Sequence, residues 1–220
     1  MRFSTRCLAP VLAAFLLLTS SAFAFDSPLS DQAVREAYFL GQRRDESMAN
    51  ILNKYTRLLS PPDSGPQIFS VTFLTPFALV VQQSSQHVNY SAQQAEKDHH
   101  ADDEIVAITI QILLTQSYGA FITRPTGPRS GSPIGIQLRN PDFWKDFNYS
   151  VFDDEKEFKV DSPAGEPTYR CDGDGGCNLT GATVHFQLPA KLFVSGDATV
   201  EIDPKVADPT FVDFDLASLR

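Results

Sequence analysis

The segment Cys171–Cys177 has the most distinctive residue types, because two aspartates alternate with glycines between its two cysteines. Alternating aspartates can surround Ca²⁺ with oxygen ligands. An EF-hand loop also requires glycine at its sixth position and glutamate at its twelfth. Counted from Asp172, those positions hold Cys177 and Thr183. The spacing therefore favours a disulfide-closed turn between strands, with glycines for positive φ and aspartates for turn hydrogen bonds.

A second group of potential metal ligands runs from His99 to Glu104, where two histidines precede three acidic residues. Adjacent histidines point in different directions on a helix or a strand, so His99 and His100 would chelate one ion poorly. The pattern favours a solvated helix end that leads into a buried strand. We assign no metal ligand and no cofactor to this segment.

Six carboxylates surround the segment that contains Phe147. Paired carboxylates could hydrolyse a glycosidic bond if a cleft held them about 5–10 Å apart, and Trp144 could stack on a sugar. The charges lie among turn residues, which favours a solvated rim, and a lone tryptophan beside a strand favours a core or edge anchor. A secreted, glycosidase-like hydrolase is the alternative hypothesis. The carboxylates are Asp142, Asp146, Asp153, Asp154, Glu155 and Glu157.

The sequence contains no signature of an activated nucleophile. It has no Gly-x-Ser-x-Gly elbow, no His-Glu-x-x-His pair, no phosphate loop and no dinucleotide fingerprint. His87 and His185 are isolated from other catalytic residue types. We therefore assign no catalytic residue, and the non-enzymatic reading is favoured.

The amino terminus has the pattern of a cleavable signal peptide. Arg2 and Arg6 form a basic n-region, Val11–Leu18 is an apolar h-region, and Ala22 and Ala24 are the small residues that a signal peptidase reads. These features predict that residues 1–24 are removed and that the protein is exported. An uncleaved amino-terminal anchor is the alternative. No second apolar run reaches the roughly 20 residues of a membrane span, so we expect none after processing.

Removal of two basic residues with the signal peptide changes the formal net charge from −9 to −11. An acidic chain repels phosphate backbones, so nucleic acid is not an expected partner. Cys171 and Cys177 are then the remaining cysteines. An even count in an exported protein predicts a bridge between them, which would contribute about 2 kcal/mol for so small a loop.

The first third of the mature chain has helical periodicity. Ser30 is placed to cap a helix that begins at Asp31 and ends near Gly41. A second helix is predicted from Asp45 to Pro61–Pro62, with one apolar face from Met48 to Leu59. Residues 25–65 are therefore expected to form a helical hairpin.

Strand-like alternation follows at residues 68–74 and 104–114. Between these strands, Thr75-Pro76 and Ser91 are placed to begin two helices, which form a helical insertion at about residues 75–103. Three prolines and two glycines in Thr123–Pro133 predict a mobile loop.

The last third contains several short alternating segments separated by turn residues. This pattern predicts an α+β protein whose main part, residues 66–220, is an antiparallel β-sandwich of immunoglobulin-like general architecture. The alternative is two units divided in the Thr123–Pro133 loop. The alternating segments lie at residues 147–151, 184–188, 198–202 and 212–216, with a turn at Val206–Pro209.

Several strings of this sequence resemble those of certain uncharacterised exported bacterial proteins. They are residues 35–41, 64–66, 74–77 and 89–92. The resemblance implies a bacterial envelope or secreted location and no particular activity. We therefore expect an exported, non-enzymatic binding or structural module for an unknown protein or polymer.

Overall fold

The computed structural model describes residues 24–43, 45–125 and 134–220 and is mixed α and β with antiparallel sheets. A five-stranded sheet has the order β1-β2-β3-β9-β8, a four-stranded sheet has the order β11-β10-β6-β7, and β4 pairs with β5. The strands are β1 Thr56–Leu58, β2 Gln67–Leu74, β3 Ile105–Leu113, β4 Phe121–Pro125, β5 Ile134–Leu138, β6 Asn148–Asp153, β7 Lys156–Lys159, β8 Ala164–Cys171, β9 Cys177–Pro189, β10 Asp197–Asp203 and β11 Thr210–Asp215.

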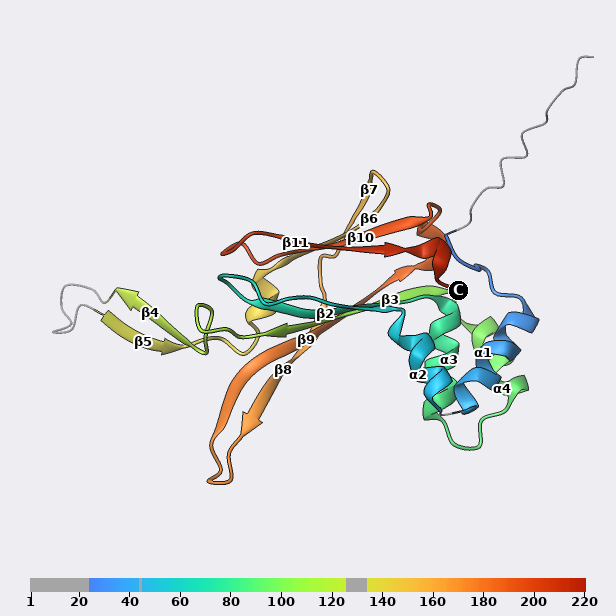
Figure 1. Ribbon diagram of the computed structural model, residues 1–220, viewed down its shortest axis with the longest axis horizontal. Helices are drawn as coiled ribbons and strands as arrows, with labels where there is room; N and C mark the ends of the chain where they lie inside the picture. Colours follow the sequence, from blue (N-terminus) through green and yellow to red (C-terminus); the bar gives the residue numbers. More distant parts are fainter. Residues whose placement is uncertain (1–23, 44, 126–133) are drawn as a thin grey trace, which may run out of the picture.

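The two larger sheets lie in two layers with one shared core (Figure 1). Strand alternation places one face of each sheet inward, as the fully buried Ile108 and Ile110 of β3 and Val200 of β10 illustrate. The layers meet at aromatic side chains, with the ring centroids of Phe73 and Phe214 5.2 Å apart. This arrangement confirms the predicted antiparallel sheets.

Four helices gather at one end of the layers (Figure 1): α1 Asp31–Arg43, α2 Glu46–Asn53, α3 Pro76–Gln86 and α4 Ala92–Ala101. The predicted caps are present, because the side chain of Thr75 accepts a hydrogen bond from Ala78 N and that of Ser91 accepts one from Gln94 N. Helix α1 lies against α3 at Gly41, where a Cβ would be 2.3 Å from the Val81 carbonyl oxygen. Glycine therefore permits this close helix crossing.

The predicted second helix is too long. Helix α2 ends at Asn53, and the chain continues as the edge strand β1, whose Arg57 pairs with Val71 of β2. The spacing of these apolar residues is compatible with a helix or with a strand, and backbone pairing with β2 stabilises the strand. Consequently Leu58, which was expected on an apolar helix face, is 73% exposed.

The predicted loop Thr123–Pro133 is also partly wrong. Thr123–Pro125 belong to β4, which pairs with β5 from Phe121↔Leu138 to Pro125↔Ile134. Residues 126–133 lie outside the described residues. The β4–β5 hairpin and the end of the β8–β9 hairpin both project from the molecule on the side away from the helices (Figure 1). The chain thus has a helical end and a hairpin end.

Candidate functional site

The cysteine-rich segment forms the tip of the β8–β9 hairpin, and the predicted Cys171–Cys177 disulfide is present. Inside the bridge, the amide of Asp172 donates to the Gly176 carbonyl (2.8 Å) and that of Gly175 to the Asp172 carbonyl (3.1 Å). Gly175 has a φ of 85°, a conformation that glycine adopts without strain. The segment is therefore a disulfide-closed turn, as its spacing predicted.

The two adjacent histidines lie at the carboxyl end of α4 and have different partners. His99 Nε2 lies 2.9 Å from Glu104 Oε1, whereas His100 Nε2 lies 2.9 Å from Asp31 Oδ1. Among the described residues, no group of three or more histidine, cysteine or acidic side chains is arranged to hold a metal ion.

Glu104 joins the amino-terminal segment to the helices. Its carboxylate accepts a hydrogen bond from the Ser27 hydroxyl (2.5 Å) and another from the Leu29 amide (2.6 Å), in addition to its contact with His99. The side chains of His99 and Glu104 are both nearly buried. Sequence reasoning placed both residues at a solvated helix end, so their burial is a correction, and its cause is the amino-terminal segment that covers them.

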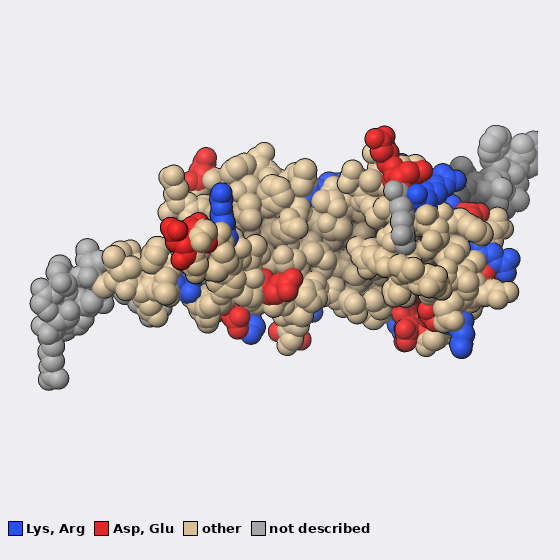
Figure 2. Space-filling model, turned by 90° about the horizontal axis from the view of Figure 1, so that it is seen from below, with Lys and Arg blue, Asp and Glu red and all other residues tan. Residues whose placement is uncertain are grey.

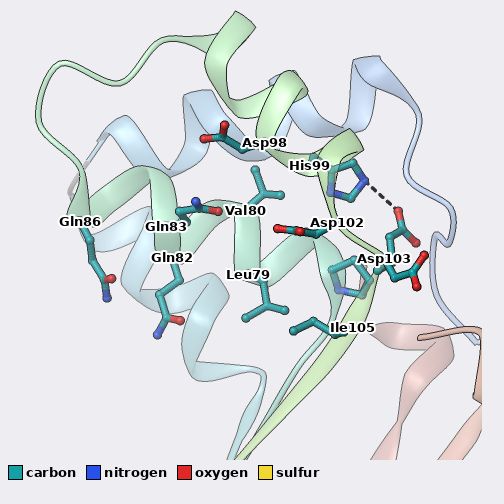
Figure 3. A pocket seen from close by; sticks show the side chains of 12 residues that line it. Leu79, Val80, Gln82, Gln83, Gln86, Asp98, His99, Asp102, Asp103 and Ile105 are labelled. Carbon is teal, nitrogen blue, oxygen red and sulfur yellow. Dashed lines mark hydrogen bonds and ion pairs between the residues drawn. The ribbon is translucent and has the colours of Figure 1, made fainter. Parts of the chain in front are cut away.

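A pocket of about 280 Å³ opens beside these residues (Figure 3). Its apolar floor is formed by Leu79, Val80 and Ile105, and polar side chains of α3, of α4 and of the segment between α4 and β3 surround it. The polar lining residues are Gln82, Gln83, Gln86, Asp98, His99, Asp102, Asp103 and Glu104. These groups suit hydrogen bonding to a small polar or cationic ligand.

Asp98 of this pocket is occupied by neighbours in the chain. It accepts hydrogen bonds from the Tyr90 hydroxyl (3.0 Å) and from Gln94 Nε2 (2.5 Å). Burial, with the Asp98 carboxylate as the second cause, raises the pKa of Tyr90 to about 12. The pocket contains amides, carboxylates and one carboxylate-bound histidine, so it offers no serine, cysteine or lysine nucleophile among its lining residues.

The carboxylates expected near Phe147 are divided among different structural roles. Asp142 pairs with Lys145 (2.7 Å), and Asp154 occupies the turn between β6 and β7 with a φ of 55°. Asp153 is buried and accepts hydrogen bonds from the amide of Val194 (3.1 Å) and from the amide and hydroxyl of Ser195 (3.0 and 2.6 Å). These contacts hold turns and loops of the fold in place. They do not direct a carboxylate toward a substrate bond.

Glu157 alone of that cluster lines a second hollow, of about 450 Å³, on the four-stranded sheet. It accepts a hydrogen bond from the Ser150 hydroxyl (2.8 Å). Lys159 Nζ lies 3.9 Å from its carboxylate, and Glu201 and Asp203 line the same hollow. The hollow is mixed in charge.

Trp144 is a core anchor, which is the interpretation that its sequence context favoured. It is 1% exposed, and its carbonyl accepts a hydrogen bond from the Tyr149 hydroxyl (3.0 Å). Gly165 of β8 lies directly against the indole, because a Cβ there would be 2.5 Å from Nε1. No face of this ring is open for a sugar.

The feature that sequence reasoning missed is the hairpin of β4 and β5, which we call the arm. Phe121 pairs with Leu138 and Thr123 with Ile136, so alternation places all four on one face. Phe121 is 64% exposed, Ile136 76% and Leu138 67%. The opposite face carries the Ile122↔Gln137 pair. The alternation of Ile134, Ile136 and Leu138 was the available signal, and the glycines and prolines around it obscured it.

The base of the arm is attached to the core. The Arg139 guanidinium stacks over the Tyr118 ring, 3.4 Å from its centroid, and Nε donates to the Gly119 carbonyl (2.8 Å). Tyr118 in turn packs against Phe143 and Phe147, with ring centroids 6.0 and 6.3 Å away. This connection holds the two strands in a defined direction.

No family model, curated protein or solved structure matches this chain. In the described part of the chain, no helix is long and apolar enough to cross a membrane.

Proposed function

We propose that this protein is an exported, non-enzymatic binding module that contacts its partner with the arm at its hairpin end. The observation that carries the proposal is the apolar face formed by Phe121, Ile136 and Leu138. This face stays exposed, whereas each of the two larger sheets buries one apolar face in the core. Contiguous exposed apolar surface on a soluble protein marks interaction sites. A two-stranded hairpin is also marginal in water by itself, so a partner would complete it.

The signal-peptide pattern and the disulfide support export to an oxidising compartment of a bacterial envelope or its surroundings. The two antiparallel layers with projecting hairpins at one end support an immunoglobulin-like general architecture, in which such ends bind partners. The resemblance to exported bacterial proteins belongs to the same proposal.

The hydrolase alternative is less favoured. It needs two carboxylates that converge across a cleft beside an open aromatic ring. Asp153 instead binds the loop at Val194–Ser195, and Trp144 is enclosed by the core.

Immobilised mature protein, residues 25–220, tests the proposal in envelope extract separated into membrane and soluble fractions. We expect specific capture by the natural sequence and its loss in the variant F121S/I136S/L138S. The matched control is V88S/V194S, because Val88 and Val194 are as exposed but lie near the helical end. Equal capture by the arm variant and the natural protein would exclude the arm as the binding surface.

A further inference from the structure

The two faces of the arm carry different side chains. One face carries Phe121, Ile136 and Leu138, and the other carries Ile122 and Gln137. In the described part of the chain its strands form a two-stranded sheet of their own, and the contact of Arg139 with Tyr118 attaches this sheet at its base. An element with an exposed apolar face suits a boundary between an apolar phase and water.

The charge of this region is opposite to that of the rest of the protein. The run of residues 105–141 contains three arginines, Arg124, Arg129 and Arg139, and no acidic residue. All 27 acidic residues of the chain lie outside this run. The described part of the arm accordingly shows no acidic side chain in Figure 2. Its charge is complementary to a negatively charged surface.

The position of the arm allows it to approach a negatively charged surface. It projects along the longest axis of the molecule, on the opposite side from the helices (Figure 1). Repulsion between exposed charges decays over about 10 Å at ordinary ionic strength. A projecting arm can therefore meet an anionic surface ahead of most of the acidic body.

We propose that the arm is an interfacial anchor that binds the surface of an anionic lipid bilayer through Phe121, Ile136 and Leu138. This inference rests on the proposed function and names its partner. The three side chains enter the boundary between headgroups and acyl chains, and the basic, acid-free sequence of the run favours an anionic headgroup layer. The strand edges carry unpaired backbone groups, so the arm stays at the hydrated interface and does not cross the membrane.

A second copy of the chain fits the arm less well. A fully buried aromatic side chain covers roughly 150–250 Å², so three partly exposed apolar side chains offer on the order of 400 Å². A stable interface takes about 800 Å² from each partner. Two facing arms would also bring like charges together. A bilayer needs no complementary shape, and attraction to anionic lipids adds to the buried apolar area.

Co-sedimentation of the mature protein with lipid vesicles tests the inference. The vesicles contain phosphatidylcholine alone or with about 30% phosphatidylglycerol, an anionic lipid of the kind that attracts basic segments. We expect pelleting with the anionic vesicles, a weaker association with the neutral ones, and loss of binding at about 1 M salt, where the screening length falls to about 3 Å.

Variants separate the apolar contribution to membrane binding from the electrostatic one. F121S/I136S/L138S should lower partitioning onto anionic vesicles at least tenfold, whereas V88S/V194S should leave it unchanged. R124Q should lower it about fivefold, because one basic residue near such a surface contributes about 1 kcal/mol. Equal partitioning of the triple variant and the natural protein would overturn the proposal.

Depth of insertion provides an independent readout. In F121W, the emission of the new tryptophan should shift to the blue on anionic vesicles and be quenched by lipids labelled in the acyl chain. V194W, near the helical end, should do neither. Trp144 is buried and gives a constant background. Unchanged emission from F121W would refute insertion.

The remaining outcomes distinguish this inference from the proposed function. The protein could fail to bind vesicles while the arm variant abolishes either a dimer in sedimentation velocity or the capture of a soluble envelope protein. In that case the lipid proposal fails and the binding function remains. If the arm variant changes neither vesicle binding nor capture, both fail.

Discussion

The two hairpins that project from one end of the molecule are protected to different degrees. The β8–β9 hairpin continues the five-stranded sheet, carries Pro167 on its outer strand and is closed by the Cys171–Cys177 bridge. These are ordinary ways to keep an exposed edge from pairing with other chains. The arm pairs only within itself and exposes apolar side chains. The fold thus protects one hairpin, and the unprotected one is where we place the binding function.

The largest expected effect comes from breaking the connection between the protected hairpin and its sheet. Gly181 is the first residue of β9 that pairs with β3, and a Cβ there would lie 2.1 Å from the Ile112 carbonyl oxygen. Because a backbone atom cannot move aside, G181A should lower the free energy of unfolding by about 3 kcal/mol. Urea denaturation measures the loss.

Gly173, in the turn of the same hairpin, provides the matched control. A Cβ there would meet no atom within 4 Å, and Gly173 does not have a positive φ. G173A should therefore leave the free energy of unfolding within about 0.5 kcal/mol of the natural value. Similar losses for both glycine variants would show that the close approach at Gly181 does not determine the pairing.

The disulfide has the next largest expected effect. C171S/C177S should lower the free energy of unfolding by about 2 kcal/mol, because the bridge closes only a small loop and restricts the unfolded chain little. The core should remain folded, which the near-ultraviolet circular dichroism of the buried Trp144 would report. Complete unfolding at room temperature would contradict this estimate.

The difference between the hairpins also explains what the sequence could predict. Strand β3 was predictable because its apolar residues alternate over its whole length, and the caps at Thr75 and Ser91 depend only on neighbouring residues. The arm was not predictable from the sequence, because β4 and β5 are short and lie beside glycines and prolines that indicate loops. No core contact strengthens its alternation.

The pocket between α3 and α4 was unpredictable for a related reason. The His99–Glu104 segment was correctly placed at a helix end before a strand. The glutamines that line it belong to another helix, α3, and the nearly buried Glu104 is covered by Ser27 and Leu29, which are far away in the sequence. Only tertiary packing brings these residues together.

The smallest expected effect on stability is that of the arm variant F121S/I136S/L138S. Each of these side chains is already mostly exposed in the folded protein, so replacing it removes little buried apolar area. Exposed substitutions of this kind usually change the free energy of unfolding by less than about 0.5 kcal/mol each. The variant should therefore unfold in urea close to the natural midpoint while losing its binding. I110S is the contrasting variant, because Ile110 is fully buried in β3 and a hydroxyl there should lower the free energy of unfolding by about 3 kcal/mol. If the arm variant instead lost more than about 2 kcal/mol, its apolar face would be packing against the body in solution, and the contrast between a protected and an unprotected hairpin would no longer hold.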